Sequence, residues 1–273
     1  MFADVLARAL GNIFSALYLL GGAYIYISLI RQIRVRTALP DLSSSASKRF
    51  DWPEALLAAG LISFLLLNVF SAASRSVALQ LTSQDLIANL LFITALVLFI
   101  ASFLRVRRFN LDALGGFSRL SFLRAVSTGI ILLIFTLPLM SISEAIVQTL
   151  FGIGSSRQEI IDLFNHSSTL QQRVIIVILA VVVAPIAEEF IFRLFLYGVL
   201  KRYLGIGLAL ILNALLFAAV HTHLPSFAPL FVLAVCFTLA YEWSGSILVS
   251  MTMHAFFNGI QLTALAFPQF VPQ

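Results

Sequence analysis

Two adjacent glutamates and an arginine lie within a strongly apolar stretch, AEEFIFR, as Glu188, Glu189 and Arg193. On a helix, Glu189 and Arg193 are four residues apart and share a face, so they can form an ion pair that neutralises both inside a bundle. Glu188 is rotated by about 100° from Glu189 and must find a partner on another helix. An unpaired carboxylate in a low-dielectric site is a candidate general base. A purely structural acidic–basic contact between helices explains the same residues equally well.

Two histidines and an asparagine follow on later apolar stretches. His221 lies one helical turn after Phe217, and Asn258 lies one turn after His254 on the same face. A lone histidine at a helix end is more often a packed residue than a catalyst, and this applies to His221. His254 and Asn258 lie together inside an apolar stretch and could donate two hydrogen bonds toward one point, which is the geometry of an oxyanion hole.

Together these stretches offer one carboxylate, two imidazoles and one amide. Such a set can activate a water and stabilise a tetrahedral oxyanion, which is sufficient for peptide-bond hydrolysis without a side-chain nucleophile. Glu188, His221 and His254 also resemble a two-histidine, one-carboxylate metal site, for which zinc is the candidate ion. The spacing is compatible with both chemistries. The remaining histidines, His166 and His223, lie in polar loops, and we assign them no role.

The elements that position these residues must cross a membrane. Of 273 residues, 60% are hydrophobic and 11% are charged, and the mean hydropathy is +1.02. Soluble domains carry about 25% charged residues. A spanning helix needs roughly 20 mainly apolar residues. The sequence therefore predicts an all-α, polytopic bundle, a single domain over residues 1–273, with about eight spans at 11–30, 53–70, 86–104, 125–143, 174–200, 204–221, 227–243 and 247–267.

Several local features refine this prediction. Pro185 lies inside the fifth span, three residues before Glu188, and predicts a kink there. The stretch 144–173 is polar enough to be an external loop or an interfacial helix. Cys236 is the single cysteine, so no intramolecular disulfide can form, and we expect it to face lipid or another helix. The first apolar stretch has no small-residue cleavage site, so we expect it to remain as a helix.

The charges orient the bundle. The net charge is +5, but the basic residues flank the apolar spans, which argues against a nucleic-acid partner. They are Arg31, Arg34, Arg36, Lys48 and Arg49 after the first span, Arg105, Arg107, Arg108, Arg119 and Arg124 after the third, and Lys201 and Arg202 after the fifth. The positive-inside rule then predicts that these three loops are cytoplasmic and that the N-terminus is outside. Charges inside the spans are concentrated in the last four, where each costs about 2.5–3.5 kcal/mol and therefore indicates function.

The ordered motifs resemble those of a known family. EExxxR at Glu188 to Arg193, FxxxH at Phe217 to His221, and HxxxN at His254 to Asn258 follow one another on successive apolar stretches. This order is similar to that of the CPBP (CAAX protease and bacteriocin-processing, or Abi) membrane proteases, which include the type II CAAX prenyl endopeptidases. The resemblance covers roughly residues 170–262. It implies an intramembrane endopeptidase with its catalytic helices in 170–267 and variable helices in 1–143.

The resemblance also implies roles for single residues. Glu188 would polarise the attacking water with His221 assisting as base, while His254 and Asn258 would form the oxyanion site. Glu189 and Arg193, with Phe217, would support this site. The favoured family mechanism needs no metal cofactor. The implied partners are a peptide or protein substrate and the lipid bilayer. Because the chain is short and shows no recognisable organelle-targeting segment, we expect its location to be a bacterial plasma membrane.

Other functions stay open at this point. The sequence contains no HExxH, GxGD or GxSG motif, so other intramembrane protease types fit poorly. A zinc-dependent metallopeptidase could use Glu188, His221 and His254. A transporter could use the buried carboxylates and histidines to relay protons or bind cargo. A membrane scaffold or immunity protein could bind a peptide without cleaving it, and it would tolerate Glu188→Gln, which a protease would not.

Overall fold

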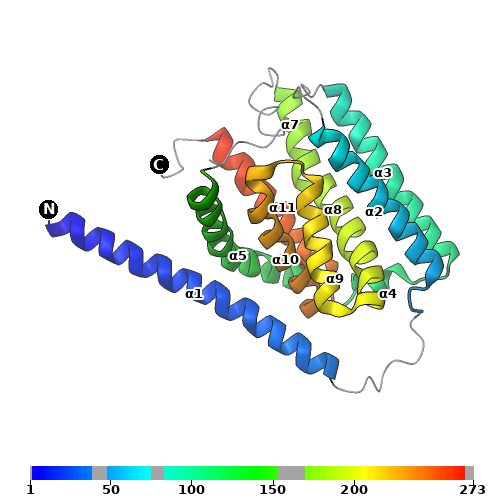
Figure 1. The fold of residues 1–273 in the computed structure, drawn as a ribbon, viewed down its shortest axis with the longest axis horizontal. Coiled ribbons are helices and arrows are strands. Elements are labelled where there is room, and N and C mark those ends of the chain that lie inside the picture. Colours follow the sequence, from blue (N-terminus) through cyan, green and yellow to red (C-terminus); the bar gives the residue numbers. More distant parts are fainter. Residues whose placement is uncertain (1, 39–47, 75–82, 153–169, 268–273) are drawn as a thin grey trace.

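The computed structural model describes residues 2–38, 48–74, 83–152 and 170–267, and the regular elements within them are helices (Figure 1). In this part of the chain, six helical runs are long and apolar enough to cross a membrane, judged by length and composition. They are Val5–Ala38, Trp52–Ala73, Ile87–Val106, Phe122–Leu150, Gln172–Val220 and Leu224–Ser244. The chain is thus a polytopic, multi-pass membrane protein with an all-α fold, as the composition predicts.

The N-terminal half contributes four long helices and one short one. They are α1 (Phe2–Ala38), α2 (Trp52–Ala73), α3 (Ser83–Val106), α4 (Leu111–Gly115) and α5 (Phe122–Phe151). Each long helix covers its predicted span and extends beyond it. The prediction of a loop over 144–173 is wrong at both ends, because α5 continues to Phe151 and α7 (Leu170–Ile178) begins at Leu170. Residues 153–169, with His166, lie outside the described residues.

The fifth and sixth predicted spans follow one another directly and are separated by a break in the helix at Gly205. They consist of α7 (Leu170–Ile178), the π-helix η1 (Leu179–Val183), α8 (Ala184–Glu189), the π-helix η2 (Phe190–Tyr197) and α9 (Gly198–Val220). The irregularity predicted at Pro185 takes the form of the π-turn that precedes it, in which the Ala184 N–H donates to the Leu179 carbonyl. The boundary between the two spans is Gly205, whose φ of 76° and ψ of 170° are non-helical and accessible to glycine.

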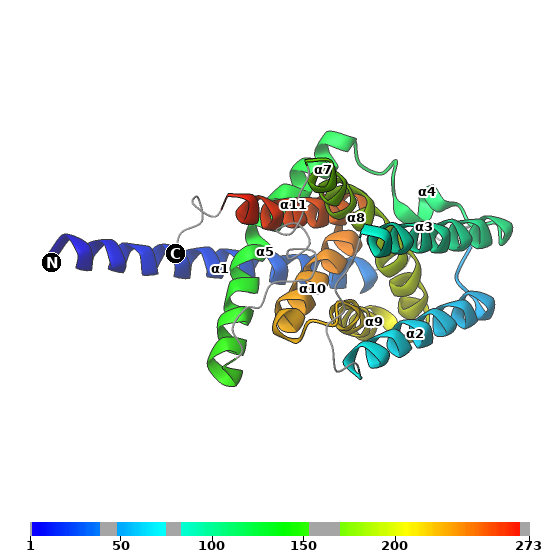
Figure 2. The same cartoon turned by 90° about the horizontal axis from the view of Figure 1, so that it is seen from above.

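Two further helices complete the bundle. A short 3₁₀ turn, η3 (Leu224–Ser226), leads into α10 (Phe227–Ser244), and α11 (Ile247–Ala266) follows. Helix α10 is central, since it packs against α1, α5, α9 and α11 (Figure 2). Cys236 is buried on it and faces other helices. Helix α11 is outside the six apolar runs, and its His254, Asn258 and Gln261 reduce its apolar content.

Helix α1 lies across the outside of the bundle and contacts α5 near a proline (Figure 1). Pro138 in α5 has no N–H, so the Ile134 carbonyl loses its intrahelical donor. The Tyr18 hydroxyl of α1 donates to this carbonyl instead. The close approach of the helices requires Gly22, because a Cβ there would lie 2.6 Å from the Phe135 carbonyl oxygen. The missing N–H of Pro138 therefore leaves a carbonyl in α5 free to accept a hydrogen bond from α1.

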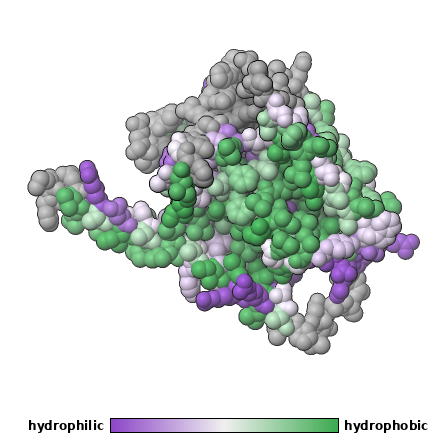
Figure 3. All heavy atoms as spheres, in the orientation of Figure 1, coloured by the Kyte–Doolittle hydropathy of each residue, from purple (hydrophilic) through white to green (hydrophobic). Residues whose placement is uncertain are grey.

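The basic clusters predicted for loops one, three and five meet at one end of the bundle. The Lys201 ammonium lies 2.6 Å from the Glu242 carboxylate at the end of α10. Arg36 at the end of α1 donates to the backbone carbonyls of Glu242 and Trp243. On the other side, Lys48 donates to the Arg107 carbonyl. Hydrophilic residues at the lower edge flank the apolar surface in Figure 3. This end is the one that the positive-inside rule predicts to be cytoplasmic.

Replacing Tyr18 by phenylalanine tests the contact between α1 and α5. The Ile134 carbonyl would then lie in an apolar environment without its donor, which costs about 1–3 kcal/mol. We expect a lower thermal unfolding temperature in detergent. Tyr24→Phe is the matched control, because Tyr24 is on the same helix and is 73% exposed. Equal effects of the two variants would show that the Tyr18 hydrogen bond does not stabilise the protein.

Candidate active site

The ion pair predicted within EExxxR is present and fully buried. The Arg193 Nη1 atom lies 2.9 Å from Glu189 Oε1, and both side chains have no exposed surface. Arg193 belongs to η2, whose residues are all buried, so its guanidinium has no route to water. A buried ion pair of this kind strongly destabilises a protein when one partner is lost, because the other charge is then uncompensated.

Aromatic rings enclose the rest of the Arg193 guanidinium. Its Cζ atom lies 4.4 Å from the centroid of the Phe217 ring, 5.3 Å from that of Phe237 and 6.0 Å from that of Phe192. Rings at these distances attract a cation electrostatically. The Nε and Nη2 atoms have no hydrogen-bond partner among the described residues, so the rings and Glu189 are what hold the charge. Phe237 of α10 was not predicted, since nothing distinguishes it from other phenylalanines in apolar stretches.

His254 of α11 lies between the two adjacent glutamates. Its Nδ1 atom is 3.0 Å from Glu189 Oε1, and its Nε2 atom is 3.8 Å from Glu188 Oε2. Because a carboxylate accepts, Nδ1 carries the proton of the first contact, and this hydrogen bond fixes the orientation of the ring. The second distance is longer than a hydrogen bond. Glu188 was predicted to find a partner on another helix, and His254 of α11 is within salt-bridge distance of it.

The two glutamates differ in their access to the outside. The Glu189 side chain is fully buried and contacts both Arg193 and His254. The Glu188 side chain is 21% exposed, although its Oε2 atom is buried and has no hydrogen-bond partner among the described residues. Glu188 is therefore the more accessible of the two carboxylates. Glu189 is already committed to two interactions inside the protein.

His221 lies at the C-terminal end of α9, beside the same aromatic cluster. Its Nδ1 atom is 2.7 Å from the Phe217 carbonyl oxygen, so Nδ1 donates and Nε2 is left to accept a proton. The Phe217 ring lies 4.7 Å from the His221 ring and 5.9 Å from the His254 ring, between centroids. Phe217 thus contacts both imidazoles and also Arg193, and it connects the three predicted motifs. The loop residue His223 contacts Ser226 instead.

Asn258 is close to the site but donates elsewhere. Its Nδ2 atom lies 2.7 Å from the backbone carbonyl oxygen of Ala180 in η1. The predicted convergence of His254 and Asn258 on one point is not seen in these hydrogen bonds, because Nδ1 of His254 donates to Glu189. The oxyanion role of the two residues stays a prediction, and the second amide hydrogen of Asn258 is the one available for it.

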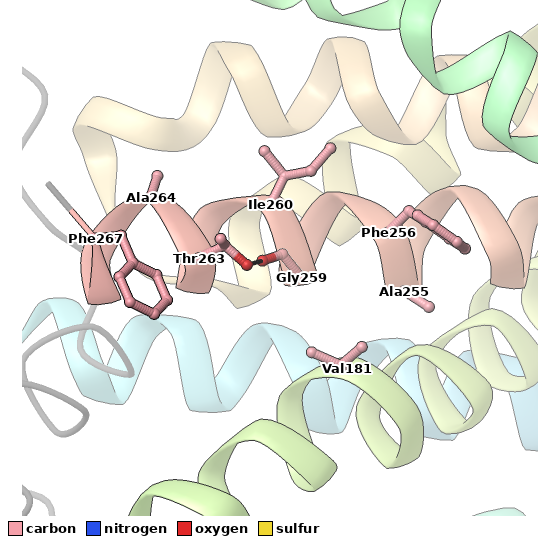
Figure 4. Close-up of a pocket in the computed structure, with 8 residues that line it drawn as sticks. All are labelled: Val181, Ala255, Phe256, Gly259, Ile260, Thr263, Ala264 and Phe267. Carbon is pink, nitrogen blue, oxygen red and sulfur yellow. Dashed lines mark hydrogen bonds between the residues drawn. The ribbon is translucent and has the colours of Figure 1, made fainter. Parts of the chain in front are cut away.

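A groove about 670 Å³ in volume runs along α11 next to these residues (Figure 4). Its lining is almost entirely apolar and consists of Val181, Ala255, Phe256, Gly259, Ile260, Thr263, Ala264 and Phe267. Val181 points toward α11 and Ala255 points back toward it (Figure 4). Ala255 follows His254 in the chain and Gly259 follows Asn258, so the groove is next to two site residues along α11, although no candidate catalytic side chain lines it. Phe256 and Ile260 are 45% and 46% exposed, so the groove opens on the outer surface of the bundle.

A three-residue metal site is not assembled in the described part of the chain. Within those residues, no group of three histidine, cysteine, aspartate or glutamate side chains is arranged to hold a metal ion. The set Glu188, His221 and His254 proposed for zinc is therefore not brought together as ligands there. Within this set, the His254 Nε2 atom lies 3.8 Å from Glu188 Oε2.

The fold and site define a class: a multi-pass helical membrane protein with a buried arginine–glutamate pair and a carboxylate–imidazole site. Residues 170–260 match the family described as type II CAAX prenyl endopeptidase Rce1-like. All three motifs lie within these residues, and the chain therefore carries a domain of this family, which is the CPBP family that the motifs resemble. No curated protein and no solved structure matches the chain.

Replacing Arg193 by methionine tests the importance of the buried pair. Glu189 would be left charged among apolar residues, and we expect a loss of about 3–5 kcal/mol in the free energy of unfolding. Arg202→Met is the control, because Arg202 is exposed on α9. Expression yield and thermal unfolding in detergent are the measurements. The double variant Glu189→Gln/Arg193→Met should recover part of the loss, and a variant Arg193→Met as stable as Arg202→Met would contradict the prediction.

Proposed function

We propose that this chain is an intramembrane endopeptidase that hydrolyses a peptide bond with a water activated by Glu188. The observation that carries this proposal is the difference in burial and contacts between the two adjacent glutamates. Glu189 is buried in an ion pair, while Glu188 is partly exposed next to His254. The match of residues 170–260 to a family of membrane endopeptidases supports the same activity. The reaction adds water across the peptide bond and releases a new carboxylate and a new amine.

Each polar side chain has a role in this proposal. Glu188 accepts a proton from the attacking water, and His221, with its Nε2 atom left as an acceptor, assists. The tetrahedral intermediate carries an oxyanion, which His254 and the second amide hydrogen of Asn258 stabilise. Because Nδ1 of His254 already donates to Glu189, the ring can donate to the oxyanion through Nε2 only as the imidazolium, in which both nitrogens carry a proton. Glu189 holds the imidazole in this orientation through that hydrogen bond.

The groove along α11 is the proposed path for the substrate. A substrate at the membrane must place an apolar segment next to the polar site without exposing its charges to lipid. The groove has an apolar lining, opens on the outer surface and adjoins His254 and Asn258 in sequence. The proposed substrate is therefore a peptide or protein associated with a membrane, which for this chain we take to be a bacterial plasma membrane.

The decisive test is cleavage of a peptide library by the purified protein in detergent, with wild type beside Glu188→Gln. The substitution preserves size but removes the base, so we expect cleavage to fall by at least about 10²-fold. Both proteins are measured with and without a strong chelator. Glu144→Gln is the matched control, because Glu144 lies on α5 outside the site.

The arms of this experiment separate the candidate functions. Cleavage that is lost in Glu188→Gln and unaffected by the chelator supports the proposal. Cleavage that is lost to both supports a zinc metallopeptidase with the same residues. Stable protein with full activity after Glu188→Gln rules out the glutamate mechanism. Peptide binding without cleavage, unchanged by Glu188→Gln, would identify a scaffold or immunity protein.

A leucine at Gly259 tests the groove. A Cβ at this position would meet only Val181 Cγ1, at 3.9 Å, so a methyl group fits, but a leucine fills the groove. We expect KM to rise roughly 10-fold or more, with a smaller change in kcat. Gly60→Leu is the control, because a Cβ at Gly60 on α2 has no atom within 4 Å. Unchanged KM in a folded Gly259→Leu variant would show that substrate takes another path.

A further inference from the structure

The Ala180 carbonyl, in the π-helix η1, has lost both of the donors that the helix could supply. In an α-helix it would accept from the N–H of residue 184, but the Ala184 N–H donates to the Leu179 carbonyl. In the π-register it would accept from residue 185, and Pro185 has no N–H. The combination of a π-turn with a proline at its end therefore leaves this one oxygen without a main-chain partner.

Asn258 supplies the missing donor from another helix. Its Nδ2 atom lies 2.7 Å from the Ala180 carbonyl oxygen. Ala180 is only 4% exposed and lies in an apolar run, so no water is at hand to replace this contact. A buried carbonyl without a donor is costly, and in a membrane it is satisfied within the protein. The Asn258 side-chain amide thus donates to the carbonyl that lacks a main-chain donor in the turn before Pro185.

We propose that Asn258 is a positioning residue that holds the π-turn before the two glutamates, and that Pro185 and Asn258 act as a coupled pair. A π-turn adds one residue to the turn relative to an α-turn. If η1 returned to the α-register, the residues after it would rotate by about 100° around the helix axis. Glu188 and Glu189 would then no longer face His254, which lies one turn from Asn258 on α11.

The same helix α11 therefore contacts the glutamate helix at two places. His254 meets Glu189 beyond the π-turn, and Asn258 meets Ala180 within it. These two contacts set both the register and the distance between the helices. This inference deepens the proposed function, because it explains how Glu188 reaches its place, but the coupling itself does not require cleavage.

A double-mutant cycle tests the coupling through thermal unfolding of the full chain in detergent. Asn258→Ala should lower the unfolding temperature by roughly 2–8 °C when Pro185 is present. In the Pro185→Ala background, residue 185 has an N–H that can donate to the Ala180 carbonyl. Alternatively, the helix can return to the α-register, in which the Ala184 N–H donates to the Ala180 carbonyl. The same Asn258→Ala change should then have little effect, whatever Pro185→Ala does by itself.

Asn213→Ala is the matched control, because Asn213 is fully buried on α9 and its amide has no hydrogen-bond partner among the described residues. Asn213→Ala should change the unfolding temperature by the same amount in the wild-type background and in the Pro185→Ala background. An equal temperature loss for Asn258→Ala in both backgrounds would overturn the proposal. This measurement decides the inference even if the wild-type protein cleaves no peptide, which would count against the proposed function alone.

The pH dependence of kcat/KM separates positioning from direct catalysis. If Asn258 positions Glu188, Asn258→Ala changes the environment of the base and shifts the pH profile, whereas Asn213→Ala leaves the profile unchanged. If Asn258 acts only as an oxyanion donor, Asn258→Ala lowers kcat at every pH, the profile keeps its midpoints, and the unfolding temperature shows no coupling to Pro185. That second pattern would refute the positioning role.

Discussion

The buried pair of Glu189 and Arg193 is the interaction on which the site depends. Neither charge reaches water, so each must be stabilised by groups that other helices bring to it. Phe217 comes from α9, Phe237 from α10, and His254 from α11. A charge pair inside a membrane bundle must be surrounded by groups that stabilise it, and these three helices supply such groups. The hydrogen bond from His254 to Glu189 ties the position of this imidazole to the buried pair.

A second constraint is that every backbone carbonyl at membrane depth needs a donor. Two prolines remove such donors, and in both cases a polar side chain from another helix replaces them. Tyr18 of α1 serves the carbonyl left by Pro138 in α5, and Asn258 of α11 serves the Ala180 carbonyl near Pro185. A defect in one helix thus becomes a specific contact between two helices. Pro138 and Pro185 thus each accompany a side-chain contact between two helices.

Much of this arrangement could be predicted from the sequence, and the rest depends on tertiary contacts. Apolar length located the spans, and the four-residue spacing of Glu189 and Arg193 predicted their pair, because both follow from local geometry. The π-helices η1 and η2 could not be predicted, since the spacing of apolar residues is compatible with both the α- and the π-register. The acceptor of Asn258 was not foreseen, because it is a backbone carbonyl on another helix. Phe237 was missed because 25 phenylalanines in apolar stretches look alike in the sequence.

The difference between Glu188 and Glu189 shows how a helix makes two identical neighbours chemically distinct. Adjacent residues point about 100° apart, so one carboxylate faces Arg193 and the aromatic rings while the other faces the partly open side. In the proposed mechanism the fixed carboxylate orients His254 and the more accessible one exchanges protons. His254 lies next to both and joins the two environments. Under that proposal the motif has two glutamates because a single carboxylate could not serve as buried ion-pair partner and as base.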